Sequence, residues 1–138
     1  MLESLEARGF QIEFHNHAKA ILAVDFPNAV DELTRAVEAM TIPIEEIIAS
    51  GGGETKGTQR LRRALAALGW KKANFVVEKT INGKPRESTS HEIDHVREFP
   101  QGVVALEIEW NNKDPFFDRD LENFKRLHAE GAISVGSL

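Results

Sequence analysis

The sequence predicts an α/β protein with a central mixed β-sheet flanked by helices, and three observations predict this fold class. In the first half of the chain, apolar residues recur mainly at helical spacing. From Trp70 onward the period changes to two, which is typical of strands. A second helical pattern follows Asp114, and a short apolar segment comes after it. The expected order is therefore helices, three strands, one helix and a last strand.

The first fifty residues predict one extended segment and two helices. Residues 11–25 mix alternation with an apolar run, so they predict extended structure or a short hairpin. Pro27 suits the first turn of a helix. The apolar residues that follow it at helical spacing are Ala29, Val30, Leu33, Val37 and Met40. Thr41 and Pro43 begin a shorter helix, and the glycine run at 51–53 ends it.

A further helix is expected over residues 58–68, with one apolar face and one basic face. The apolar face carries Leu61, Ala64, Leu65 and Leu68. The basic face carries Arg60, Arg62 and Arg63. Such a division between two faces is typical of a helix that packs on one side and meets solvent on the other.

The period of two after Trp70 predicts three consecutive strands. The first begins near Phe75, and Asn82-Gly83 is a strong signal for a tight hairpin turn. The returning strand reaches Asp94 and the residues after it. A turn at 100–102 then leads into an apolar strand over residues 103–110.

The last part of the sequence predicts one helix and one strand. Asp114 can cap the helix and Pro115 fits its first position. Its expected apolar face consists of Phe116, Phe117, Leu121, Phe124 and Leu127. Gly131 ends this helix, and residues 132–138 predict a strand. Because an apolar strand without a polar tail is an unusual terminus, we expect a fragment or a shortened C-terminal part.

Length and composition indicate a single domain over residues 1–138, with a mainly helical part at 1–69 and a sheet and helix at 70–138. The chain has no cysteine, which excludes disulfides and cysteine-based zinc sites. The first residues do not resemble a signal peptide, and no apolar stretch is long enough to cross a membrane. A cytoplasmic location is therefore expected.

The formal net charge is −5, but basic residues are concentrated in the middle of the chain. Residues 56–86 contain nine Lys or Arg side chains and one acidic side chain, Glu78. Such a segment could contact phosphate groups. A solvated helix face followed by a charged hairpin would explain the same pattern, and charge alone does not decide between them.

Three carboxylates on two neighbouring strands are the candidate chemical centre. Glu107 and Glu109 are two residues apart, so a strand would project both to the same side. Burying like charges is costly unless a cation neutralises them. Magnesium could be held by Asp94, Glu107 and the carbonyl oxygen of Ile108, and could activate a water molecule at phosphorus. The alternative is that these acids line a solvated sheet face.

The sequence resembles the type II restriction endonucleases of the Bgl type, which are similar to the Bam type and belong to the PD-(D/E)xK nuclease superfamily. The resemblance rests on Asp94, on Glu107-Ile108-Glu109 and on the stretch 110–121, Trp-Asn-Asn-Lys-Asp-Pro-Phe-Phe-Asp-Arg-Asp-Leu. The acid motif is weak by itself, whereas the longer run is more specific. The order of helices and strands also fits a restriction-endonuclease-like core.

The resemblance implies roles for individual residues. Asp94 corresponds to the metal-bridging acid, and Glu107 to the second metal ligand. Glu109 stands where the superfamily usually has lysine, and it could orient or deprotonate the attacking water or bind a second metal. Further candidates for the site are Glu54, Glu92 and His91. Candidates for contacts with DNA are Lys56, Arg60, Arg63 and Lys113.

The resemblance also implies an activity, a cofactor and partners. It predicts a site-specific deoxyribonuclease that needs Mg²⁺, acts on double-stranded DNA as a homodimer and reads a palindrome containing GATC. In this family much of the base reading comes from segments beyond the last strand found here. The alternatives are a truncated or inactive module that binds metal, dimerises or binds DNA without cutting, and a small metal-dependent hydrolase with another substrate.

Overall fold

The computed structural model describes residues 1–40, 56–109 and 114–138, and for residues 114–116 it describes the main chain alone. The described residues form two compact units. The first comprises Met1–Trp70 with Phe99–Gln101, and the second comprises Lys71–Glu98 with Gly102–Leu138. That the whole chain is one domain stays a prediction.

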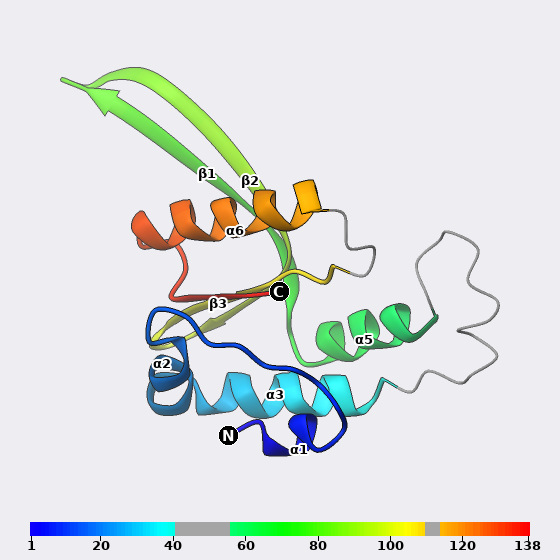
Figure 1. Cartoon of the computed structure of the whole chain (residues 1–138). Coiled ribbons are helices and arrows are strands. Elements are labelled where there is room, and N and C mark those ends of the chain that lie inside the picture. Colours follow the sequence, from blue (N-terminus) through cyan, green and yellow to red (C-terminus); the bar gives the residue numbers. More distant parts are fainter. Residues whose placement is uncertain (41–55, 110–113) are drawn as a thin grey trace. The chain divides into compact units, whose positions relative to one another are not determined.

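Helix α3 (Pro27–Glu38) is the centre of the first unit. It contacts α1 (Glu3–Glu6), α2 (Ala18–Asp25) and α5 (Lys56–Ala67) (Figure 1). Pro27 occupies the first turn, as expected, because a proline there loses no intrahelical hydrogen bond. Of the residues predicted for its apolar face, Ala29 and Val30 are buried and Leu33, Val37 and Met40 are half-buried, whereas the buried Ala36 was not predicted.

The expectation of extended structure over residues 11–25 is wrong, because residues 18–25 form helix α2. A short apolar run does not distinguish a strand from a helix by its period. Here the three alanines among these eight residues favour the helix, since alanine has the highest helix propensity. Only Leu22 is buried on α2, and Val24 is 77% exposed.

Helix α5 confirms the helix expected over residues 58–68, within two residues at its start and one at its end. Leu61 and Leu65 are its buried apolar residues, as predicted from their spacing. The shorter helix expected after Thr41, and its end in the glycine run, lie outside the described residues.

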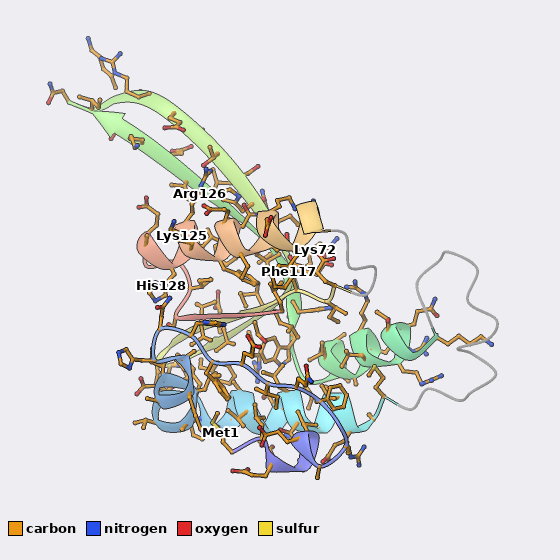
Figure 2. All side chains as sticks on the ribbon, in the orientation of Figure 1. Met1, Lys72, Phe117, Lys125, Arg126 and His128 are labelled. Carbon is orange, nitrogen blue, oxygen red and sulfur yellow. The ribbon has the colours of Figure 1, made fainter. Side chains whose placement is uncertain are left out.

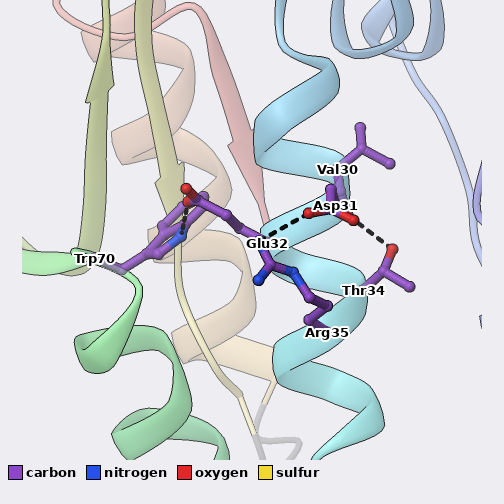
Figure 3. A network of polar contacts seen from close by, with 6 residues as sticks. All are labelled: Val30, Asp31, Glu32, Thr34, Arg35 and Trp70. Carbon is purple, nitrogen blue, oxygen red and sulfur yellow. Dashed lines mark hydrogen bonds and ion pairs between the residues drawn. The ribbon is translucent and has the colours of Figure 1, made fainter.

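A buried hydrogen bond connects α3 with the residue that follows α5. The indole Nε1–H of Trp70 donates to Oε2 of Glu32 over 2.9 Å (Figure 3). Trp70 is 1% exposed and Glu32 8% exposed, so water does not compete for this bond. The neighbouring ion pair between Arg35 and Asp31 is exposed, and a pair of this kind contributes little to stability.

The second unit is built on a mixed four-stranded sheet, which confirms the predicted fold class. Its strands are β1 (Lys71–Ile81), β2 (Lys84–Phe99), β3 (Gly102–Leu106) and β4 (Val135–Ser137), in that spatial order. β1 and β2 are antiparallel, whereas β3 and β4 are parallel. β1 and β2 form a long hairpin that extends well beyond the two shorter strands (Figure 1).

The hairpin confirms the turn predicted at Asn82-Gly83. Both residues have positive φ angles, 52° and 74°, as a two-residue type I′ turn requires. At the other end of the hairpin, Lys71 pairs with Val96 and Ala73 pairs with Ile93. Two residues of β2 therefore oppose the single residue between Lys71 and Ala73, which is a β-bulge.

The strand expected over residues 103–110 is shorter than predicted. β3 ends at Leu106, and residues 107–109 have no regular secondary structure. The Glu107 N–H still donates to the carbonyl oxygen of Ser137, but Ser137 is the last residue of β4. β4 therefore offers no further partner to the residues that follow Glu107, and the chain leaves the sheet at this point.

Helix α6 (Asp114–Ala129) covers the core of the second unit. The buried cluster consists of Ile93, Val96, Ala105, Phe124, Leu127 and Ile133. Phe124 and Leu127 were expected there, whereas Phe117 and Leu121 are each 46% exposed, so the predicted apolar face is wrong for these two. Asp120 takes the buried position one turn before Phe124 and is 4% exposed.

The C-terminal end of α6 is basic. Lys125, Arg126 and His128 lie in its last turns (Figure 2). Positive charge at this end interacts favourably with the helix dipole. Gly131, with φ at 73°, follows the helix and supports the prediction that it ends the helix. Across the part of the chain that the structure describes, no helix has the length and apolar character needed to cross a membrane.

The ring of Phe124 lies directly on Gly136 of β4. A Cβ atom added at Gly136 would lie 2.5 Å from Cγ of Phe124, which is far inside normal contact distance. This close approach lets α6 sit tightly against the sheet edge formed by β4.

We therefore expect Gly136→Ala to destabilise the protein by about 1–3 kcal/mol, because the methyl group forces Phe124 out of its place in the core. The free energy of unfolding in urea measures this effect. Ser137→Ala, one residue along β4, is the control, since it adds no atom. Equal stability of Gly136→Ala and wild type would contradict the close packing.

Candidate active site

A hollow of about 370 Å³ in the second unit collects acidic side chains from three segments of the chain. We call it the acidic hollow. β2 contributes Ser90, His91, Glu92 and Asp94 to its lining. The segment after β3 contributes Glu107, Ile108 and Glu109, and α6 contributes Arg119, Asp120 and Asn123.

Asp94 and Glu107 are joined directly. The main-chain N–H of Asp94 donates to Oε1 of Glu107 over 3.2 Å. Glu107 is 8% exposed, and its own N–H is held by Ser137, so its position is fixed from both ends. A main-chain hydrogen bond of this kind offsets part of the cost of burying a carboxylate.

The bulge in β2 sets the direction of Asp94. Asp94 and His95 are the two residues that face the single β1 residue Lys72. Because of the extra residue, Ile93 and Val96 both point into the core although they are three positions apart. Asp94 lies between them and lines the acidic hollow instead.

Glu109 and Asp120 form a second pair of acids. A side-chain hydrogen bond with Asp120 raises the pKa of Glu109, and burial and the charge of Asp120 act in the same direction. Arg119 counters this effect, whereas the charge of Asp94 adds to it. Glu109 is therefore a stronger base than an exposed glutamate.

Arg119 holds Asp120 from its other side. Nε and Nη2 of Arg119 both lie 3.1 Å from Oδ1 of Asp120. This contact raises the pKa of Arg119 further, so the guanidinium stays charged. Oδ2 of Asp120 is buried, and among the described residues no N–H or hydroxyl group donates to it, since Glu109 can donate to Asp120 only when it is protonated.

A lysine from β1 stands beside Glu92 and Asp94. Nζ of Lys72 lies 3.2 Å from Oε1 of Glu92 and 3.9 Å from Oδ1 of Asp94. Its side chain is 62% exposed, so it can exchange these partners for a bound anion (Figure 2).

The donor chemistry of the acidic hollow suits a hard divalent cation. All of its carboxylates offer oxygen, which Mg²⁺ prefers over nitrogen and sulfur. Among the described residues no group of three or more His, Asp or Glu side chains is drawn together tightly enough to hold a metal ion. Pairs of acids are present, and Mg²⁺ commonly uses one or two carboxylates with water and substrate oxygens as its other ligands.

The model of the family described as "Restriction endonuclease BglII/BglIII" matches residues 10–138. The chain belongs to this family. It is therefore a nuclease of the restriction endonuclease type, and its substrate is DNA. Comparison with curated proteins found no match, and comparison with solved structures found none either.

The structure brings together most of the site residues predicted for this restriction endonuclease. Those that line the acidic hollow are Asp94, Glu107, Ile108, Glu109, Glu92 and His91. Their chemical roles remain predictions. Glu54 and Lys113 lie outside the described residues, as do the other residues at 110–113 of the run that carries the resemblance.

The predicted DNA contacts Lys56, Arg60 and Arg63 all lie on α5, in the first unit. Lys56 and Arg63 are exposed, as a contact with phosphate requires. Arg60 is half-buried, and its Nε is fully covered, so its guanidinium is less accessible than the sequence predicts.

Asp120 and Arg119 are the charged members of the acidic hollow that the sequence did not reveal, and Ser90 and Asn123 are its other lining residues that were not predicted. A signal was present, because Asp120, Phe124 and Leu127 follow helical spacing on one stripe of α6. An acid in line with two core residues indicates a buried charge, and such charges are typical of functional sites.

Glu109→Gln tests the raised pKa. Because the pKa of Glu109 in the folded state lies above its value of about 4.3 in an unfolded chain, the folded protein binds this proton more tightly. The stability of the wild type therefore falls as the pH rises through the folded-state pKa. Glutamine does not titrate, so the stability of the Glu109→Gln variant does not show this fall with pH.

The free energy of unfolding of Glu109→Gln, relative to wild type, should thus increase as the pH rises above about 4. Urea unfolding with a metal chelator present measures it. Glu122→Gln, at an exposed position of α6, is the control. A difference that does not change with pH would contradict the raised pKa.

Proposed function

We propose that this chain cleaves double-stranded DNA by Mg²⁺-dependent hydrolysis at the acidic hollow. The observation that carries the proposal is the hydrogen bond that joins Asp94 to Glu107 in the lining of the acidic hollow, which Glu109 lines as well. The family membership supports the reaction class, and the acids support the dependence on a divalent cation.

Each acid has a distinct task in this proposal. Asp94, Glu107 and the carbonyl oxygen of Ile108 would hold Mg²⁺. When bound, the ion supplies Lewis-acid stabilisation of the charge that develops on the phosphate. Glu109 accepts the proton of the water molecule that attacks phosphorus in line, and the bond to the leaving sugar oxygen breaks. Its raised pKa suits it to this task.

Lys72 supplies positive charge in this proposal. Glu109 occupies the position where the superfamily usually carries lysine, so a cation is missing there. Lys72 reaches Asp94 and Glu92 from the neighbouring strand and is exposed enough to contact a phosphate oxygen. A lysine that binds an anionic substrate acts as a point charge.

Recognition of a palindrome that contains GATC, and action as a homodimer, belong to the same proposal. They rest on the resemblance to Bgl-type and Bam-type enzymes. Lys56 and Arg63 on α5 are proposed contacts with DNA phosphates, and Arg60 and Lys113 complete this set. The ends of the cleavage products would reveal the site that is read.

Asp94→Ala and Glu107→Gln should each lower the rate of plasmid cleavage by at least about a hundredfold, because each removes charge from the reacting centre. The assay compares supercoiled, nicked and linear plasmid with and without Mg²⁺. Glu98→Gln, on the same strand as Asp94 but exposed, is the matched control. Cleavage at the wild-type rate by either site variant would contradict the assignment of that residue to the reacting centre.

The wild type itself separates two functions in this assay. Discrete Mg²⁺-dependent fragments support the nuclease. Binding of metal or DNA without any cleavage would favour the alternative of a module that no longer cuts.

Lys72→Ala should lower cleavage about ten- to a hundredfold, which corresponds to about 1.5–3 kcal/mol for a hydrogen bond to a charged group. Lys79→Ala is the matched control. Lys79 lies on the same strand, is 67% exposed and pairs with Glu87 over 3.7 Å, so it differs from Lys72 chiefly in its distance from the acidic hollow. Equal effects of the two substitutions would refute a specific role for Lys72.

A further inference from the structure

We propose that Asp120, carried by α6, is a ligand for a divalent cation in the acidic hollow, next to Glu109. The inference rests on the proposed function, because it concerns the same hollow and the same kind of cation. It adds a helix-borne acid to the set that the strands provide.

The first argument is the unsatisfied oxygen of Asp120. The residue is 4% exposed, and it lines the acidic hollow. Arg119 uses only Oδ1, and among the described residues no N–H or hydroxyl group donates to Oδ2. The hydrogen bond between Glu109 and Asp120 exists only while one of the two acids is protonated. Leaving a buried charged acceptor without a partner costs more than about 1–3 kcal/mol, so such an atom requires an explanation.

The second argument is the position of Asp120 on the helix. It shares a buried stripe with Phe124 and Leu127, where an apolar side chain would stabilise the core without any desolvation cost. Arg119 compensates part of that cost and at the same time fixes the orientation of the carboxyl group. A ligand that is held in place before the cation arrives binds it with less loss of entropy.

The third argument is the contact with Glu109. Two ionised carboxylates have no proton to share, so they repel each other at neutral pH. A cation between them removes the repulsion. A divalent cation held by Asp120 offsets the charge of both acids, and Mg²⁺ needs only one or two carboxylates beside water and phosphate oxygens.

Calorimetric titration of the metal-free full chain with Mn²⁺ and with Mg²⁺, at one fixed pH, tests the inference. The variants are Asp120→Asn, which is nearly isosteric, and Asp118→Asn, which removes the same charge from an exposed position two residues earlier on α6. We expect Asp120→Asn to weaken binding about ten- to a hundredfold, and Asp118→Asn to bind as the wild type does.

Urea unfolding checks that each variant is folded. If Asp120→Asn does not fold, Asp120→Ser carries the same expectation, because it is smaller and its hydroxyl can still accept a hydrogen bond from Arg119.

The outcomes separate the inference from the proposed function. Wild-type affinity in Asp120→Asn, with binding lost in Asp94→Ala, would overturn the role of Asp120 and leave the nuclease centre standing. Equal losses in Asp120→Asn and Asp118→Asn would also overturn it, since they would reflect net charge alone. If the wild type binds neither ion, the inference fails, and the plasmid assay decides the proposed function independently.

Discussion

Repulsion between carboxylates is the constraint on which the second unit depends. Asp94, Glu107, Glu109 and Asp120 line one hollow, and so many like charges stay together only if the protein supplies compensation. That compensation comes from several parts of the fold: a main-chain N–H for Glu107, the lysine of β1 for Asp94, and a guanidinium for Asp120. Each donor is placed by a different element, so the site forms only when the sheet and α6 have come together.

Packing of α6 on the sheet therefore determines the electrostatics of the acidic hollow. Phe124 lies on Gly136, and Leu127 is completely buried in the same cluster. Asp120 is one turn before Phe124, so the fit of one ring over one glycine sets how far the carboxyl group reaches toward Glu109. A shift of the helix by a fraction of an ångström would change the interaction between these two acids, because Coulomb energies at short range depend steeply on distance in a poorly hydrated site.

Local signals in the sequence predicted the hairpin and the position of the acids well. Asn82-Gly83 suffices for its turn because only a few residues accept two positive φ angles in succession. Glu107 and Glu109 were found from their spacing of two on an apolar segment, and Asp94 was added from the preceding strand. The bulge opposite Lys72 was not predictable, since a single extra residue leaves the alternation almost unchanged on either side. Helix α2 was missed because its apolar run suits both helix and strand.

Asp120 shows why the site was only partly visible in the sequence. Its role depends on which face of α6 is buried. Packing on β4 buries the face that carries Asp120 and leaves Phe117 and Leu121 exposed. With Glu109 in place of the usual lysine, the hollow holds one negative charge more and one positive charge fewer than a lysine would give. Lys72 and Arg119 restore part of the balance from outside the motif. The remaining negative charge attracts a divalent cation to the acidic hollow. The acid on α6 contributes to this charge together with the acids on the strands.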